Sequence, residues 1–344
     1  MLSEKEIKEL VQDYGQQVNE GRTIRQIIQD GDLPRLECAT LLEGKVSDSV
    51  FCEELVTKSG EPIRLMYRGN RISTHDQNRG EVPFKDQVLA YNHDHMLDLV
   101  QGVLGSSQFS VPDLKPTSTV IPAENLNLIK LENVLRLYMA TSGTSTNMGN
   151  QYLNKGVRDF GGHHLPEGLV ANCKLPYLMD TPSTKEESDR TVDQKYLFDN
   201  DICTQAQYDQ IRNGSMMAFG IVTEYLRNKG MILVDTKTEH GINSKGQIVV
   251  ADELYTMDSS RFWKLNDDGT IMNRNGVPVS FSKEFAREMI KEDGQMFTPE
   301  QTNEIAIRYI QGLQDLTGIT FEPDLRPRDE RIVESTNLIL DYLI

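Results

Sequence analysis

The pattern of apolar and polar residues predicts strands in the first part of the chain and helices in the last part. Residues 40–68 and 116–142 contain runs rich in β-branched and aromatic residues, which favour strands. Residues 204–228 and 329–342 instead repeat their apolar positions at helical spacing. The sequence therefore predicts an α+β protein with a smaller, β-rich N-terminal lobe.

Signals at the ends of segments refine these predictions. Residues 1–31 are predicted to be helical, with Ser3 and Glu6 as a capping box, and they look like an element appended to the rest. Further predicted features are a helix over 86–104, polar loops over 143–150 and 180–192, a C-cap at Gly230, a hairpin over 231–254 and a helix start at Thr298–Gln301.

Composition restricts the class of protein. The chain has 344 residues, a formal net charge of −16 and four cysteines without a CxxC pair. Such a charge disfavours sequence-independent nucleic-acid binding, and the cysteine spacing gives neither a zinc signature nor a disulfide framework. The N-terminus lacks a signal-peptide apolar region, and no apolar run approaches the ~18 residues of a membrane span. We therefore expect a cytoplasmic protein without a nucleic-acid or membrane partner, and the oligomeric state stays open.

Residues 231–263 contain the most informative chemistry. In a strand, alternate residues share a face, so Asp235, Lys237 and Glu239 point the same way. If a hairpin forms, Asp252 can approach Glu239 near Lys237. Two carboxylates and a lysine suit magnesium and a triphosphate, although the same pattern also fits a solvated charged face.

Three shorter segments offer weaker candidates. Gly44 lies between two strand-like runs, next to Lys45, and its backbone could approach a phosphate, although taken alone the segment is better explained as an ordinary hairpin turn. The DTPSTK segment and the Asp258–Arg261 segment could bind anions or be purely structural. None of the six histidines has metal-ligand spacing, and we interpret all of them as structural or surface residues.

Taken together, seven segments resemble the SAICAR synthase family in order and spacing, roughly from residue 40 to the C-terminus. The strongest are LPEGLVANCKLPYLMDTPSTKEES, ILVDTKTEHG followed by GQIVVADELYTMDSSRFW, and SFSKEFAREMI. LLEGKVSD, NRISTHD, VPFKDQ and ENVLRLYM match less closely. The resemblance implies a two-lobed fold related to ATP-grasp and kinase-like folds. It also implies an N-terminal extension (1–34), a nucleotide-binding lobe (35–131) and a lobe with the substrate and metal site (132–344).

The resemblance also implies roles for individual residues. ATP would be bound by Gly44, Lys45, Lys237 and Glu239, and Mg2+ by Glu239 and Asp252. The catalytic residues would be Lys237, Asp258 and Arg261. The substrates would be contacted by Arg71, Ser73, Asp76, Lys85, Arg136, Ser142, Ser183, Thr184, Lys185, Asp258 and Arg261.

The implied reaction is the ATP-dependent condensation of L-aspartate with carboxyaminoimidazole ribotide through an acyl phosphate. Several positions depart from the family pattern, namely Ser47, Asn70, Asp86, Thr141 and His240. Ser47 replaces a cation, and we expect either that a neighbouring basic residue such as Arg68 compensates or that ATP binds more weakly. These departures leave two alternatives open: a divergent ligase with another amino acid or carboxylate, and a non-catalytic nucleotide-binding protein.

Overall fold

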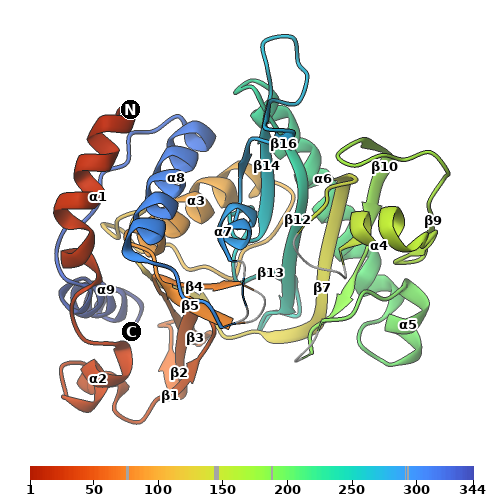
Figure 1. Cartoon of the computed structure of the whole chain (residues 1–344). Helices are drawn as coiled ribbons and strands as arrows, with labels where there is room; N and C mark the ends of the chain where they lie inside the picture. The colour runs from red at the N-terminus through yellow and green to blue at the C-terminus, as the bar shows by residue number, and fades with distance from the viewer. Residues whose placement is uncertain (75–76, 143–146, 187–188, 291, 293) are drawn as a thin grey trace. The chain divides into compact units, whose positions relative to one another are not determined.

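The computed structural model describes residues 1–74, 77–142, 147–186, 189–290, 292 and 294–344. The chain divides into two compact units (Figure 1). Unit 1 comprises residues 1–95, 107–125 and 286–344, and unit 2 comprises residues 96–106 and 126–285. Residues 286–344 thus pack in unit 1, whereas the predicted division grouped them with the C-terminal lobe. The assignment of 1–34, 35–131 and 132–344 to separate functions stays a prediction.

Unit 1 contains an antiparallel sheet in the order β1-β2-β3-β6. Its strands are β1 (Thr40–Glu43), β2 (Ser47–Val56), β3 (Pro62–Arg68) and β6 (Val120–Glu124), and a separate hairpin is formed by β4 (Arg71–Thr74) and β5 (Gln77–Glu81). The helices are α1 (Glu4–Asn19), α2 (Ile24–Gln29), the first part of α3 (Lys85–Val100), the end of α7 (Glu284–Met289), α8 (Pro299–Thr317) and α9 (Arg328–Leu343).

The N-terminal helix is an integral part of unit 1. Ser3 and Glu6 form the predicted capping box, which supplies partners to the first free N–H groups of α1. Helix α1 packs beside α8, as Figure 1 shows, and α2 packs against α9. Apolar residues of α2, β2, β3 and α9 share one core, which includes Ile27, Leu65 and Ile339. The predicted helices at both ends of the chain are therefore confirmed.

Unit 2 is organised around a second antiparallel sheet, in which β10-β7-β12-β14-β17 lie side by side. Strand β11 also pairs with β7, and β13 pairs with β12. The strands are β7 (Asn127–Tyr138), β10 (Lys174–Asp180), β11 (Ser183–Thr184), β12 (Met231–Ile242), β13 (Ile248–Ala251), β14 (Ser260–Lys264) and β17 (Ser280–Phe281). The remaining elements are α4 (Met148–Lys155), α5 (Gln194–Asp199), α6 (Gln205–Arg227) and the two-residue strands β8 (Asp159–Phe160), β9 (His163–His164), β15 (Asn273–Arg274) and β16 (Val277–Pro278).

Two predicted boundaries in unit 2 need correction. Met148–Asn150, predicted to be loop, begin helix α4 because the Asn147 side chain caps it by accepting from the Asn150 N–H. The rest of that predicted loop, residues 143–146, lies outside the described residues. Helix α6 ends with Asn228 as its C-cap, and Gly230 takes a positive φ two residues later. In the part of the chain that the structure describes, no helix is long and apolar enough to cross a membrane.

Candidate active site

The register of the unit 2 sheet brings charged residues of three strands into line. Asp235 in β12 lies directly opposite Arg136 in β7 and Arg261 in β14. Further along β12, Glu239 lies opposite Glu132 of β7. Since residues two apart share a face of a strand, these charges and Lys237 lie on one face of the sheet.

Asp235 is buried and holds both arginines. Arg261 donates from Nε to the two carboxylate oxygens at 2.9 and 3.1 Å, and from Nη2 at 2.5 Å. Arg136 reaches the same carboxylate from Nη1 at 3.3 Å and donates from Nε to the Thr181 hydroxyl at 2.9 Å. Burial lowers the pKa of Arg136, while for Arg261 the Asp235 carboxylate outweighs burial and raises the pKa. The carboxylate therefore fixes two planar guanidinium groups beside each other on the sheet.

Lys237 lies between the two carboxylates that the register places opposite each other. Its Nζ is 2.5 Å from Glu132 Oε1 and 2.9 Å from Glu239 Oε1, and Lys185 pairs with the other oxygen of Glu239. Like charges directly across a strand pair repel, so the two lysines offset the Glu132–Glu239 repulsion. Burial opposes the charged form of Lys237 and Glu239, but their opposite charges raise the pKa of Lys237 and lower that of Glu239.

This cluster contradicts one of the alternatives open at the sequence level, the solvated charged face. Asp235 is 6% exposed and Glu239 is 7% exposed. Buried charges are tolerated when they are paired and hydrogen-bonded, and both carboxylates have two cationic partners. A buried cluster of paired charges, several with shifted pKa values, is a candidate functional site.

Asp252 differs from its neighbours in backbone conformation and exposure. Ala251 is the cross-strand partner of Glu239, and Asp252 follows it with an exposed side chain and a φ of 59°. A left-handed conformation is uncommon for a residue other than glycine, although aspartate adopts it more readily than most. Among the described residues, no group of three or more histidine, cysteine or acidic side chains could hold a metal ion. A magnesium–nucleotide complex needs only one or two carboxylates, so the pair Glu239 and Asp252 fits that ion chemically.

The TPSTK segment is fixed by two buried carboxylates. Ser183 donates its hydroxyl proton to Glu132 at 2.9 Å, and the Thr184 hydroxyl accepts from the Arg190 N–H. At the start of the segment, Asp180 is buried and accepts from Tyr208 at 2.7 Å and from Arg212 at 2.8 Å. His163 also approaches the Asp180 carboxylate, at 3.2 Å. Despite burial, these partners lower the pKa of Asp180 to about 2.

Arg261 also contacts the segment that carries Ser142. It donates from Nη1 to the Thr141 carbonyl at 3.1 Å, and Asn150 donates to the Ser142 carbonyl at 2.6 Å. The Asp258 carboxylate lies 3.6 Å from Nζ of Lys283.

The predicted site residues of unit 2 thus form two groups. Arg136 and Arg261 both contact Asp235, and Lys185 and Lys237 both contact Glu239.

In unit 1, Asp48 connects the Gly44 turn to Arg71. The Gly44 N–H donates to the Ser47 carbonyl at 3.0 Å and to the Asp48 carboxylate at 3.3 Å. A side chain at Gly44 would lie 2.4 Å from that carbonyl, so the turn requires glycine. Arg71 pairs with the same Asp48 oxygen at 2.6 Å.

The remaining candidates in unit 1 lie around the β4–β5 hairpin. Ser73 and Lys85 are buried, and the Lys85 ammonium is 6.0 Å from the centroid of the Tyr309 ring. Asp76 lies outside the described residues. Arg68 is the cross-strand partner of Ser47, which is the position expected of a compensating cation.

Four acidic residues of these clusters were not predicted as site residues from the sequence, namely Glu132, Asp235, Asp180 and Asp48. Glu132 and Arg136 are four residues apart in one strand, so period-two alternation predicts that they share a face. The same alternation groups Asp235 with Lys237. No comparable signal exists for Asp180 and Asp48, whose partners come from distant segments.

His240 is buried beside Glu239, and burial lowers its pKa to about 4, in agreement with a structural histidine.

The chain matches a known protein family and curated proteins in sequence. The family model described as SAICAR synthetase matches residues 41–303. A chloroplastic phosphoribosylaminoimidazole-succinocarboxamide synthase of Arabidopsis thaliana is 32% identical over 313 residues, which cover 88% of this chain and 73% of the relative. The phosphoribosylaminoimidazole-succinocarboxamide synthase of Legionella pneumophila strain Paris is 32% identical, with 76% of this chain and 85% of the relative covered.

Solved structures with similar folds carry the same family name. The structure named SAICAR-synthase from Saccharomyces cerevisiae complexed with SAICAR has a TM-score of 0.67 at 22% identity. It covers 83% of this chain and 97% of its own. A structure named SAICAR synthetase (Type-2) in complex with ADP has a TM-score of 0.60 at 20% identity, with 83% and 100% covered. These likenesses support the mixed helix-and-sheet fold described above.

Proposed function

Because this chain belongs to the SAICAR synthetase family, we propose that it is an ATP-dependent ligase of purine biosynthesis that joins L-aspartate to carboxyaminoimidazole ribotide. The products are SAICAR, ADP and phosphate. The observation that carries this proposal is the charged face of the unit 2 sheet, where the family-like D-T-K-x-E segment meets Glu132, Arg136 and Arg261.

The chemistry begins with activation of a carboxylate, which resists attack by an amine. A ribotide carboxylate oxygen attacks the terminal phosphorus of ATP, and the bond to the bridging oxygen breaks to release ADP. The aspartate amine then attacks the carbonyl carbon of the acyl phosphate. Phosphate leaves with the original carboxylate oxygen, and the amine loses a proton. Each step brings anions together, so positioned cations lower the barrier by stabilising the charge that moves.

Lys237 and Lys185 suit the phosphoryl-transfer step. Both ammonium groups pair with Glu239, and the charges of Glu239 and Glu132 outweigh burial and raise the pKa of Lys237, which favours its charged form. In the proposed assignment, Glu239 and Asp252 hold Mg2+ with ATP, while Gly44 and Lys45 contact the phosphates. Mg2+ would neutralise phosphate charge during transfer.

Arg136 and Arg261 suit the ribotide. Two guanidinium groups held on one carboxylate present several N–H donors in fixed planes, which is the arrangement that favours phosphate and carboxylate ligands. We assign Ser142, Asp258, Ser183 and Thr184 to the same substrate. In unit 1, we assign Arg71, Ser73, Asp76 and Lys85 to the ribotide as well.

Three finer assignments rest on the sequence. We propose that the fold is related to ATP-grasp and kinase-like folds, and that residues 1–34 are an extension to the family core. The family match begins at residue 41, in agreement with the second proposal. A cytoplasmic location is the third, although the Arabidopsis thaliana relative is named as chloroplastic.

The test is product formation by the purified protein. With ATP, Mg2+, L-aspartate and carboxyaminoimidazole ribotide, we expect ADP release and a product with the mass of SAICAR. Omission of any one substrate should stop product formation, and omission of ATP or the ribotide should also stop ADP release. Multiple turnovers of ADP release without aspartate, or the absence of the product, would overturn the proposal.

A further inference from the structure

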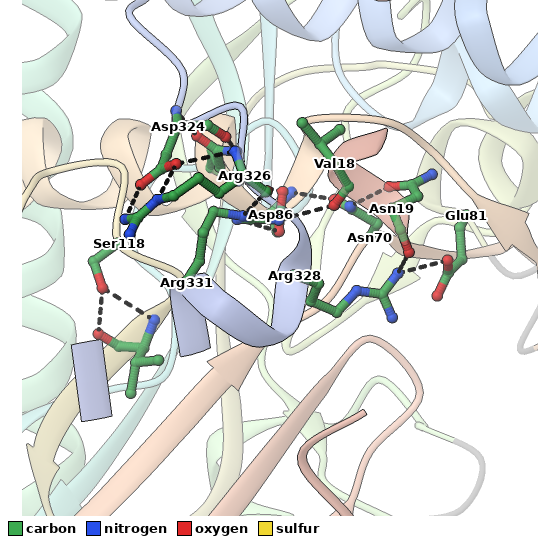
Figure 2. A network of polar contacts seen from close by, with 12 residues as sticks. Val18, Asn19, Asn70, Glu81, Asp86, Ser118, Asp324, Arg326, Arg328 and Arg331 are labelled. Carbon is green, nitrogen blue, oxygen red and sulfur yellow. Dashed lines mark hydrogen bonds and ion pairs between the residues drawn. The ribbon is translucent and has the colours of Figure 1, made fainter. Parts of the chain in front are cut away.

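A buried polar network in unit 1 joins the N-terminal segment to the start of α3 and to α9 (Figure 2). Its centre is formed by Asn70, Asp86 and Arg331, which are 0%, 1% and 4% exposed. Three polar side chains this deeply buried are costly unless each is hydrogen-bonded. Their partners therefore indicate what the network holds in place.

Arg331 spans three segments of the chain. It donates from Nη1 to Asp86 at 3.1 Å, from Nη2 to the Val18 carbonyl at 3.0 Å and from Nε to the Arg326 carbonyl at 3.1 Å. The Val18 carbonyl belongs to the last turn of α1, where carbonyl groups lack partners within the helix. One guanidinium group thus fixes the end of α1 against the first turn of α3.

Asn70 makes a second set of links between the same segments. Its side-chain oxygen accepts from the Asp86 N–H at 2.8 Å, and its Nδ2 donates to the side-chain oxygen of Asn19 at 2.5 Å. Its carbonyl accepts from the Val82 N–H at 2.8 Å. Asn70 therefore uses side chain and backbone to join α1, the β4–β5 hairpin and α3.

Arg328 reinforces this arrangement from α9. Its Nη2 donates to the Asn19 carbonyl at 2.9 Å and to Glu81 at 2.7 Å, as Figure 2 shows. Close packing adds a further constraint, because a side chain at Gly15 of α1 would lie 3.2 Å from the Pro83 ring. The residues between β5 and α3 are thus held from both ends of the chain.

The network contacts both ends of the hairpin to which we assign ribotide binding, at Asn70 and Glu81. Asn70 immediately precedes Arg71, and Asp86 immediately follows Lys85. We propose that Asn19, Asn70, Asp86 and Arg331 are positioning residues, which set the hairpin and the start of α3 so that Arg71, Ser73 and Lys85 meet the ribotide. The proposal rests on the ribotide assignment above. It gives the N-terminal segment, which lies outside the family match, an indirect part in substrate binding, through the hairpin that it holds in place.

The physical basis is the sensitivity of polar recognition to small displacements. A shift of about 1 Å in a positioning group can cost on the order of a hundredfold in rate. Asn19 offers the mildest perturbation, because it is only partly buried and ends a helix. Asn19→Ala removes the acceptor of Asn70, whereas Asn19→Asp keeps an oxygen in the same place.

The experiment compares Michaelis constants for the ribotide and for ATP in Asn19→Ala, Asn19→Asp and Asp86→Asn. We expect Asn19→Ala and Asp86→Asn to raise the ribotide constant by about tenfold or more and to leave the ATP constant within twofold. Asn19→Asp should stay close to wild type. Arg35→Ala removes an exposed ion pair to Asp341 of α9 and serves as the matched control, with neither constant changed.

Hydrogen exchange of residues 70–87 provides a readout that needs no ligand. Faster exchange of these amides in Asn19→Ala, but not in Asn19→Asp or Arg35→Ala, is the expected result. Unchanged exchange, or a ribotide constant within twofold of wild type in a variant with normal thermal stability, would overturn the positioning role. If wild type turned over no ribotide, the proposed function would have failed, and the exchange result would still decide whether the network orders the hairpin.

Discussion

Asp235→Asn tests the structural basis of the arginine pair. The substitution keeps the size of the side chain but removes the charge that both Arg136 and Arg261 contact, at 3.3 Å and 2.5–3.1 Å. All three side chains have little exposure, between 9% and 16%. Removing one partner of a buried ion pair costs about 3–5 kcal/mol. Because Asn retains one acceptor oxygen, we expect the lower end, about 3 kcal/mol.

The assay is thermal unfolding of the full chain, together with kinetics. For a unit of this size, about 3 kcal/mol corresponds to a decrease in Tm of roughly 6 to 12 °C. At a temperature where the variant is folded, the Michaelis constant for the ribotide should rise, and that for ATP should change little. The matched control is Asp268→Asn, in an exposed turn of the same unit, which should leave Tm nearly unchanged. A Tm within about 2 °C of wild type for Asp235→Asn would refute the reasoning.

Three further predictions concern single groups of unit 2. Arg261→Lys keeps the charge but loses the planar fork, so the ribotide constant should rise about tenfold, and a change confined to the ATP constant would exclude the assignment. Asp252→Asn, exposed and outside the core, should weaken Mg·ATP binding in a titration without lowering Tm, and full activity would remove it from the metal site. Asp180 has its pKa lowered from 3.8 to about 2, so its ionised form stabilises the fold by about 2 kcal/mol above pH 4. That stability is lost as the pH falls from about 4 to 2, and Asp180→Asn should flatten this part of a urea-unfolding profile. Asp180 also raises the pKa of His163. Protonated His163 therefore stabilises the fold below the ordinary pKa of histidine, and this stabilisation is lost as the pH rises through the pKa of His163 in the folded protein.

Much of the secondary structure follows from local signals. The capping box at Ser3 and the Thr298-Pro299 start of α8 are formed by side chains within three residues of each other, so the sequence contains the whole signal. The hairpin of β12 and β13 follows in the same way from two apolar runs around a polar turn. Alternation along β12 also predicted correctly that Asp235, Lys237 and Glu239 share a face.

The partners of these charges could not be predicted, because they depend on the order of strands in the sheet. Strand β12 pairs with β7, about a hundred residues earlier, and only that pairing places Glu132 against Lys237. The burial of these charges could not be predicted either, because a charged strand looks solvated until its neighbours are known. The network of Asn19, Asn70 and Arg331 joins segments from both ends of the chain, and no local pattern indicates it.

Transfer of oxygen from the ribotide to phosphate tests the central claim most directly. The ribotide is prepared with 18O in its carboxylate and turned over with ATP, Mg2+ and L-aspartate in unlabelled water. Activation through an acyl phosphate predicts that each phosphate released carries one 18O atom from the ribotide, detected by mass spectrometry. Phosphate without label, formed together with SAICAR, would contradict the proposed mechanism.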